Sequence, residues 1–296
     1  MSLPLSKRFR MDVPVSDAES EASTLPVITR SKYWFKDGNV VLQAEETQFR
    51  VHQSMLAHHS RVFNDLFGIP QPEVSQDPMV DGCPLVPLSD TAADVRQIMA
   101  IFYDNISFLD LRNSMQVDQI SAMLRMGKKY EIDYLMNEAL QRLRCNYPTT
   151  LAVWDESFDS SNPNPIEDVN DSVLNAGIIS LGHEHSIFTI LPSAYFHYTT
   201  KTSPEAIVSG EDDDFLISPE RPAVLYELKN VFWSMDDGVI TDLAPWVPNE
   251  TISVKLCASC LASVKACFEE ARQQLWQELP AFFGFAKWED LRDFDS

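Results

Sequence analysis

The chain has 296 residues, 45% of them hydrophobic, which is enough for one large or two ordinary domains, and its formal net charge is −21. So acidic a chain repels phosphate, which excludes nucleic acid as its main ligand. No apolar run approaches the roughly 18 residues of a membrane span, and the N-terminus lacks the apolar segment of a secretory leader. Five cysteines, an odd number, indicate free thiols in a reducing compartment. We therefore expect an intracellular protein, cytoplasmic, nuclear or both, with no membrane partner.

Residues 1–28 are rich in Ser, Pro, Glu and Asp without a sustained period, which predicts a disordered tail. The basic cluster Lys7–Arg10 in this tail is either a nuclear-import signal or a chance cluster. The aromatic run Tyr33–Phe35 that follows is expected to pack on the core rather than to bind a ligand.

The segment 37–67 changes from the period of strands to that of helices. Val40–Ala44 and Gln48–Val51 have the β-branched and aromatic content of short strands and flank polar residues, which predicts a β-hairpin. A short helix around Leu56 follows, and Ser60 is a good N-cap for a second one. The apolar face of that second helix consists of Val62, Phe63, Leu66 and Phe67.

Four prolines between Gly68 and Pro84 argue against a regular helix or a central strand there, so we expect a long loop before a strand at Leu85–Leu88. Thr91 and Asp94 have the spacing of a capping box that opens the next helix. The apolar face of this helix repeats at i, i+3, i+4 and i+7 and consists of Val95, Ile98, Met99 and Phe102.

Two more helices are expected before Pro148. The first has Val117, Ile120, Leu124 and Gly127 on one side. The second is expected to be capped by Asp133, and its apolar face consists of Leu135, Leu140 and Leu143.

The second half reads as helical with irregular connectors. A helix containing Leu174, Ile178 and Leu181 is expected to stop at Gly182. Another is expected over residues 225–235, and a long one from about Ser253 to Glu278, stopping at Pro280.

An ordered set of residues carries a family resemblance. The set consists of Phe49-Arg50-Val51-His52, Leu56, Ser60 and Phe63. It closely resembles the signature of the BTB (POZ) domain, and Met126–Tyr130 resembles a later step of the same family. The resemblance covers 33–148 and implies an α+β fold, a small sheet flanked by helical hairpins, followed by a mostly α-helical domain at 149–296. By this resemblance, the residues that fix the domain are Val40, Phe49, Arg50, His52, Leu56 and Phe63. The segment from Leu275 to Leu291 resembles a tail found in many fungal BTB proteins.

The resemblance also implies a function, because BTB domains are interaction modules that often self-associate and often recruit a cullin to build a ubiquitin ligase. We therefore expect protein partners, a homodimer or other homo-oligomer, and a cullin as a further partner. Only residues 25–36 precede the first predicted strand, without a helical period, so the extra helix of long-form relatives is not expected.

Five residues are candidates for protein interaction by this resemblance: Asn39, Arg50, His52, Asp94 and Phe102. In dimeric relatives a basic residue at the position of Arg50 and an acidic one on the first strand line an interface groove. Asn39 stands here at the usual acidic position, so Arg50 is either a groove residue or an ordinary surface arginine. Cullin-binding relatives open the helix after the third strand with an apolar-x-Glu step, which the turn Ala92–Val95 matches only with Asp94.

Motifs for catalysis or cofactors are weak in this sequence. No glycine pair has a G-x-G spacing and no G-K-[ST] occurs, so no nucleotide or other cofactor is expected. His52 is expected to be structural, and no activated nucleophile is evident, so we expect no enzyme.

The alternative function is a zinc-binding or thiol-dependent enzyme centred on Cys257 and Cys260. Together with Val264 and Cys267, these residues form one helical stripe, which favours packing in a core. The segment His183–His185 is expected in a solvated loop, which disfavours a zinc site that combines it with the cysteines.

Overall fold

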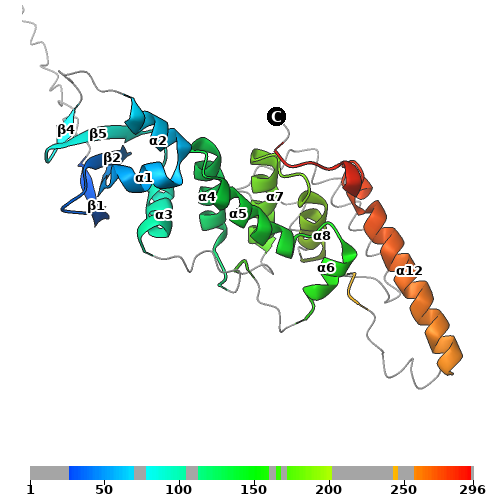
Figure 1. Ribbon diagram of the computed structural model, residues 1–296. Helices are drawn as coiled ribbons and strands as arrows, with labels where there is room; N and C mark the ends of the chain where they lie inside the picture. Colours follow the sequence, from blue (N-terminus) through cyan, green and yellow to red (C-terminus); the bar gives the residue numbers. More distant parts are fainter. Residues whose placement is uncertain are drawn as a thin grey trace, which may run out of the picture.

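The computed structural model describes residues 27–69, 78–104, 113–159, 165–167, 172–201, 243–245 and 257–294. Figure 1 shows these parts arranged roughly in chain order, with a small sheet at one end and helices alone toward the other. The expected α+β class is confirmed: a mixed domain comes first and a helical part follows.

Within the described ranges, one sheet of five strands has the order β1-β3-β2-β5-β4. The strands are β1 (Thr29–Trp34), β2 (Val40–Ala44), β3 (Thr47–Val51), β4 (Met79–Val80) and β5 (Cys83–Leu88). The predicted hairpin is confirmed, because β2 and β3 pair antiparallel with Val40 opposite Val51. The strand expected at Leu85–Leu88 pairs in parallel with β2.

The sheet extends further than the sequence pattern predicts at both edges. β1 pairs in parallel with β3, and within it Tyr33 is buried as expected. The sequence pattern predicts a long loop up to Pro84. This prediction is wrong for the last residues of that range, because β4 and the first residues of β5 form a hairpin there. Asp81 and Gly82 close this hairpin with φ angles of 47° and 78°, as tight hairpin turns require. Pro84 is tolerated because it pairs only with β4, a two-residue strand at the edge.

Three helices cover the sheet: α1 (Gln53–His59), α2 (Arg61–Gly68) and α3 (Ala92–Tyr103). The predicted N-cap at Ser60 is confirmed, since its Oγ accepts the N–H of Phe63 at 3.1 Å. The same hydroxyl donates to the carbonyl of Tyr130 at 2.6 Å and so joins α2 to the end of α4 (Val117–Lys129). Thr91 caps α3 by accepting the N–H of Asp94.

Helix α4 packs closely against α5 (Asp133–Asn146). Gly127 is needed at their contact, because a Cβ there would lie 2.7 Å from Cγ of Met136. The predicted cap of α5 is wrong: Ile132 occupies the N-cap position and Asp133 is the first helical residue. Position 133 is still favourable for a carboxylate, since the first turn of a helix attracts negative charge.

The second half contributes α6 (Leu151–Glu156), α7 (Ser172–Glu184), α8 (Leu191–Lys201), α12 (Ala258–Phe282) and the short helix η2 (Trp288–Asp290). The predicted stop at Gly182 is wrong, because α7 continues to Glu184. Gly182 instead allows α8 to approach closely: a Cβ at this position would lie 2.5 Å from Cδ2 of Leu191.

The predicted stop of the long helix at Pro280 is also wrong, because α12 runs through Pro280 to Phe282. A proline inside a helix removes the N–H that would bond the carbonyl four residues earlier, here that of Trp276. The indole Nε1 of Trp288 donates to this carbonyl at 2.7 Å. The helix therefore passes the proline because a side chain from η2 replaces the missing donor.

One continuous cluster of buried residues joins the sheet and α3–α5 to α7 and α8. In Figure 1, α7 and α8 lie beside the α4–α5 pair, on the side away from the sheet. A second cluster anchors α12 and consists of Trp154, Phe196, Leu243, Trp276 and Leu279. The boundary expected near residue 148 thus crosses a shared core, and the domain limits stay a prediction.

Some expectations lie outside the described residues: the tail up to residue 26, the cluster Lys7–Arg10 and the helix at 225–235. In the parts that are described, no helix combines the length and the apolar character that crossing a bilayer requires.

Candidate interaction surface

The five candidate interaction residues fall into two groups. Asn39, Arg50 and His52 lie where the β2–β3 hairpin meets α1, whereas Asp94 and Phe102 lie on α3. The two on α3 are eight residues apart, which is about 12 Å along a helix. They therefore do not form one patch with each other.

Asn39 and Arg50 each bond to a different backbone group. Oδ1 of Asn39 accepts the N–H of Gln53 at 2.8 Å, which satisfies a free donor in the first turn of α1. Nε of Arg50 donates to the carbonyl of Gly38 at 2.9 Å. This close approach requires a glycine, because a Cβ at position 38 would lie 2.9 Å from Cγ of Arg50.

His52 is held from two sides. The hydroxyl of Tyr103 accepts the backbone N–H of His52 at 3.1 Å and lies 3.2 Å from its Nδ1. Nε2 lies 3.4 Å from Oδ2 of the exposed Asp37. The pKa of Asp37 is lowered, first by its own backbone N–H and then by His52. Burial raises the pKa of Tyr103, which keeps this phenol neutral. The histidine thus joins α1 to α3, which matches the structural role expected of it.

The edge strand β1 is fixed to the end of α3 by an aromatic and ionic cluster. The rings of Phe35 and Tyr103 lie with centroids 4.6 Å apart. Oδ2 of Asp104 accepts hydrogen bonds from Nζ of Lys32 and Oη of Tyr33, both at 2.7 Å. Both bonds lower the pKa of Asp104, and the bond from Lys32 has the larger effect. β1 is therefore a well-anchored edge rather than a loosely attached strand.

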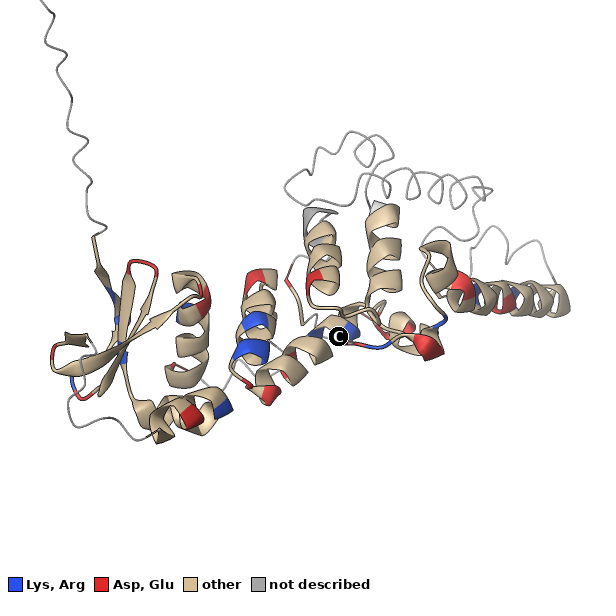
Figure 2. Cartoon of the chain, turned by 90° about the horizontal axis from the view of Figure 1, so that it is seen from above, with Lys and Arg blue, Asp and Glu red and all other residues tan. Residues whose placement is uncertain are grey.

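Asp94 and Phe102 make contacts inside the domain. Asp94 is buried, and its two oxygens accept bonds from Arg125 of α4, from Nε at 3.0 Å and from Nη2 at 2.8 Å. The ring of the buried Phe102 stacks on His59 with centroids 4.4 Å apart. Figure 2 shows the basic segments of α4 beside α3, where this ion pair forms.

Exposed apolar side chains mark both edges of the sheet. Val27 and Ile28, directly before β1, are 79% and 43% exposed. Met79 on β4 is 59% exposed, and Ile69 after α2 is 60% exposed. Sequence reasoning did not single out these residues, because the exposure of Val27, Ile28 and Met79 depends on which strands lie at the edges, and that of Ile69 on how α2 packs.

The cysteine stripe of α12 does not pack into a core, so that prediction is wrong. Cys257, Cys260 and Cys267 are exposed, and Val264 is 39% exposed. The reason is that this half of the helix extends beyond the helices that cover the other half, as Figure 1 shows. The buried residues of α12 begin only at Arg272.

The expectation of a solvated loop at His183–His185 is also wrong. His183 lies in the last turn of α7, where Nε2 is 3.0 Å from Oη of Tyr195. His185 is only 6% exposed, and burial lowers its pKa. Across the described ranges, no group of three or more His, Cys, Asp or Glu side chains is placed to hold a metal ion.

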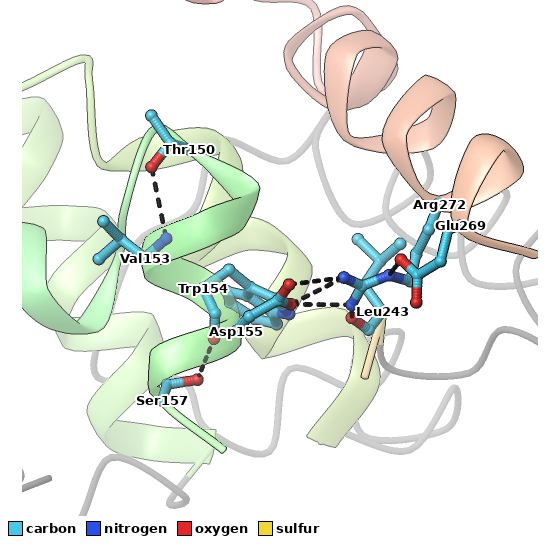
Figure 3. Close-up of polar contacts among 8 residues, drawn as sticks. All are labelled: Thr150, Val153, Trp154, Asp155, Ser157, Leu243, Glu269 and Arg272. Carbon is cyan, nitrogen blue, oxygen red and sulfur yellow. Dashed lines mark hydrogen bonds and ion pairs between the residues drawn. The ribbon is translucent and has the colours of Figure 1, made fainter. Parts of the chain in front are cut away.

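A buried arginine that sequence reasoning missed attaches α12 to α6 (Figure 3). Nη2 of Arg272 bonds both oxygens of Asp155, at 2.9 and 2.7 Å, and Nε bonds Glu269 at 3.0 Å. Nη1 also donates to the carbonyl of Leu243 at 2.6 Å. Arg142 plays a similar part on α5, since it donates to Glu138 and to the carbonyls of residues 113 and 165. The sequence could have indicated these ion pairs, because Glu138 lies four residues before Arg142 and Glu269 lies three residues before Arg272.

Comparison with protein families gives a match of residues 33–146 to the BTB/POZ domain. The match ends where α5 ends. Searches of curated proteins and of solved structures returned no significant match.

Proposed function

Because residues 33–146 match the BTB/POZ domain, we propose that the protein acts through contacts with other proteins and self-associates through this segment. Such domains are typically interaction modules without catalytic activity. The observation that carries the proposal is the anchored edge strand β1 with exposed apolar residues directly before it.

An edge strand presents backbone N–H and C=O groups that can pair with a second chain. The basic side chains of β1 are already paired, Arg30 with Asp81 at 2.9 Å and Lys32 with Asp104 at 2.7 Å. These pairs leave Val27 and Ile28 as the apolar part of the edge. Because β1 is anchored before association, pairing with a partner orders few additional groups. Two copies related by a two-fold axis would bring the same residues together.

Light scattering coupled to size-exclusion chromatography of the full chain tests this proposal. Wild type is expected to be a dimer or larger, and the double variant Val27→Asp/Ile28→Asp a monomer. Ile69→Asp/Val264→Asp is the matched control, because it adds the same two charges at exposed apolar residues that do not belong to the sheet. A monomeric wild type would reject self-association, whereas equal effects of both charge changes would reject the β1 edge as the interface.

The candidate residues Asn39, Arg50 and His52 act in this proposal by holding the hairpin and the start of α1 in place. Arg50 bonds a backbone carbonyl, which supports its interpretation as a surface arginine over a charged groove residue. If Arg50 lines a groove instead, Arg50→Ala would weaken dimerisation without lowering thermal stability.

Recruitment of a cullin is a narrower prediction. The turn Ala92–Val95 exposes Ala93, while Asp94 is bonded to Arg125, so an acidic contact with a cullin would first have to break this ion pair. Because Asp94 is held by Arg125, self-association is favoured over cullin binding. Failure of the full chain to retain a cullin N-terminal domain in a pull-down at high protein concentration would reject the cullin prediction.

The zinc or thiol enzyme remains the rival function. Its cysteines are exposed at the start of α12, far along the chain from the BTB/POZ domain. Stoichiometric zinc in the purified protein would favour it. Unchanged partner binding and stability in Cys257→Ala/Cys260→Ala would show that protein interaction does not depend on these thiols, and would dismiss the enzyme as the main function.

A further inference from the structure

Two exposed thiols lie in the first turn of α12, at the end of the helix that projects furthest from the other helices in Figure 1. Cys257 is the N-cap residue, and its Sγ accepts the backbone N–H of Cys260 at 3.4 Å. Cys260 lies three residues later, so both thiols belong to the same turn. The helix that carries them is 25 residues long.

The position of Cys257 favours its thiolate form. The free N–H groups and the dipole at the start of a helix stabilise negative charge. The pKa of Cys257 is lowered accordingly, first by the backbone N–H of Cys260 and then by the Cys260 side chain. The thiolate is the nucleophilic form of cysteine, and an exposed thiolate can reach a reagent in solvent.

A purely structural role does not explain this pair. The thiols do not fill a core, because both are exposed. Capping alone does not require sulfur, since Ser, Thr, Asp and Asn are the preferred N-cap residues. A structural zinc site needs four ligands, and no such group is formed by the residues that the structure describes.

We propose that Cys257 and Cys260 are a redox-active dithiol that small disulfides convert into an intramolecular disulfide. The thiolate of Cys257 attacks one sulfur of glutathione disulfide, which forms a mixed disulfide and releases one glutathione thiolate. The thiol of Cys260 then loses its proton and attacks Sγ of Cys257, which releases the second glutathione. Two protein thiols are oxidised and one glutathione disulfide is reduced to two glutathiones. This site is independent of the proposed BTB/POZ interface.

The full chain, first reduced, is incubated with glutathione disulfide and analysed by intact mass, non-reducing gel and peptide mapping. The expected product is a monomeric chain on the gel, lighter by two hydrogens, with Cys257 linked to Cys260. Cys260→Ser is expected to stop at the mixed disulfide and retain one glutathione on Cys257. Cys257→Ser keeps a hydroxyl cap, so the helix persists, and the disulfide is expected to disappear.

Cys267→Ser is the matched control, since Cys267 is exposed on the same helix but two turns beyond Cys260. It is expected to oxidise like wild type. At neutral pH, Cys257 is expected to react with iodoacetamide several-fold faster than Cys267. Equal alkylation rates, a disulfide to Cys267, or cross-linked chains in place of an internal disulfide would each overturn the proposal.

Discussion

Replacing Arg272 by Met removes the ionic attachment of α12 to α6 while it keeps an apolar side chain of similar length. Arg272 is 2% exposed and bonds Asp155, Glu269 and the carbonyl of Leu243. The substitution leaves two carboxylates without their cation and one carbonyl without its donor. We therefore expect a loss of stability that is larger than for any surface ion pair.

The size of the effect follows from burial. Breaking a fully buried ion pair costs about 3–5 kcal/mol. The side chains of Asp155 and Glu269 are 35% and 31% exposed, so water can solvate these carboxylates in part once the guanidinium is removed. We expect a loss of about 2–3 kcal/mol, which for a chain of this size lowers Tm by roughly 4–12 °C.

Thermal unfolding followed by circular dichroism measures this loss, and tryptophan fluorescence reports on the cluster around Trp154 and Trp276. Arg61→Met is the control, because Arg61 and Asp133 are 74% and 71% exposed and their pair is worth about 0–1 kcal/mol. A Tm for Arg272→Met equal to that of Arg61→Met would refute the reasoning. Asp155→Asn combined with Arg272→Met should lose less than the sum of the two single changes.

Three further predictions concern single contacts. Ser60→Ala should cost about 1–3 kcal/mol in urea unfolding, because α2 loses its cap and the carbonyl of Tyr130 loses a donor. Trp288→Phe should cost about 1–2 kcal/mol, because the carbonyl of Trp276 is left without the indole N–H. His185→Leu should reduce the loss of stability on acidification. Burial lowers the pKa of His185, so its contribution is complete above the unfolded value near 6.5 and falls as pH drops below it, by up to about 1.4 kcal/mol per pH unit.

Control variants separate the loss of these single contacts from a nonspecific loss of stability. Ser54→Ala changes an exposed serine of α1 and should leave stability within about 0.5 kcal/mol of wild type. Trp288→Phe retains an aromatic ring against Trp276, so a loss confined to the hydrogen bond is expected. The histidine argument fails if stability between pH 7 and pH 5 falls equally steeply with and without His185. Glu184, Arg125 and Lys128 also influence this histidine and are retained in the variant.

Local patterns were sufficient for most of the segment that matches the BTB/POZ domain. The hairpin at Val40–Val51, the cap at Ser60 and the apolar face of α3 follow from short-range periodicity and capping chemistry. These features are encoded within a few residues, so a single sequence discloses them. The buried state of Val95 and Met99 confirms the helical period.

The errors arise where distant residues decide the outcome. β1 forms because β3 supplies its backbone partners, and no alternation within Thr29–Trp34 announces this pairing. Gly182 permits helix packing instead of ending α7, because Leu191 lies against it. Pro280 remains helical because Trp288, eight residues later, supplies a donor.

The candidate interaction residues come from a family resemblance, which does not reveal the bonds that their side chains make. Asp94 was expected at a partner surface, yet its ion pair with Arg125 could not be read from sequence, because 31 residues separate the two. The exposed cysteines show the opposite case. Their spacing suggested a buried stripe, whereas this half of α12 extends past the described helices that cover its other half.

The core shared by α4, α5, α7 and α8 has a consequence for synthesis on the ribosome. The sheet and the first five helices emerge before α7 and α8, so their apolar contact face stays uncovered until about 50 more residues have been translated. At ribosomal speeds this delay is on the order of seconds. An apolar face that stays uncovered during synthesis is open to aggregation or chaperone binding, and Phe283, Phe285 and Phe294 complete its cover only when the end of the chain has been made.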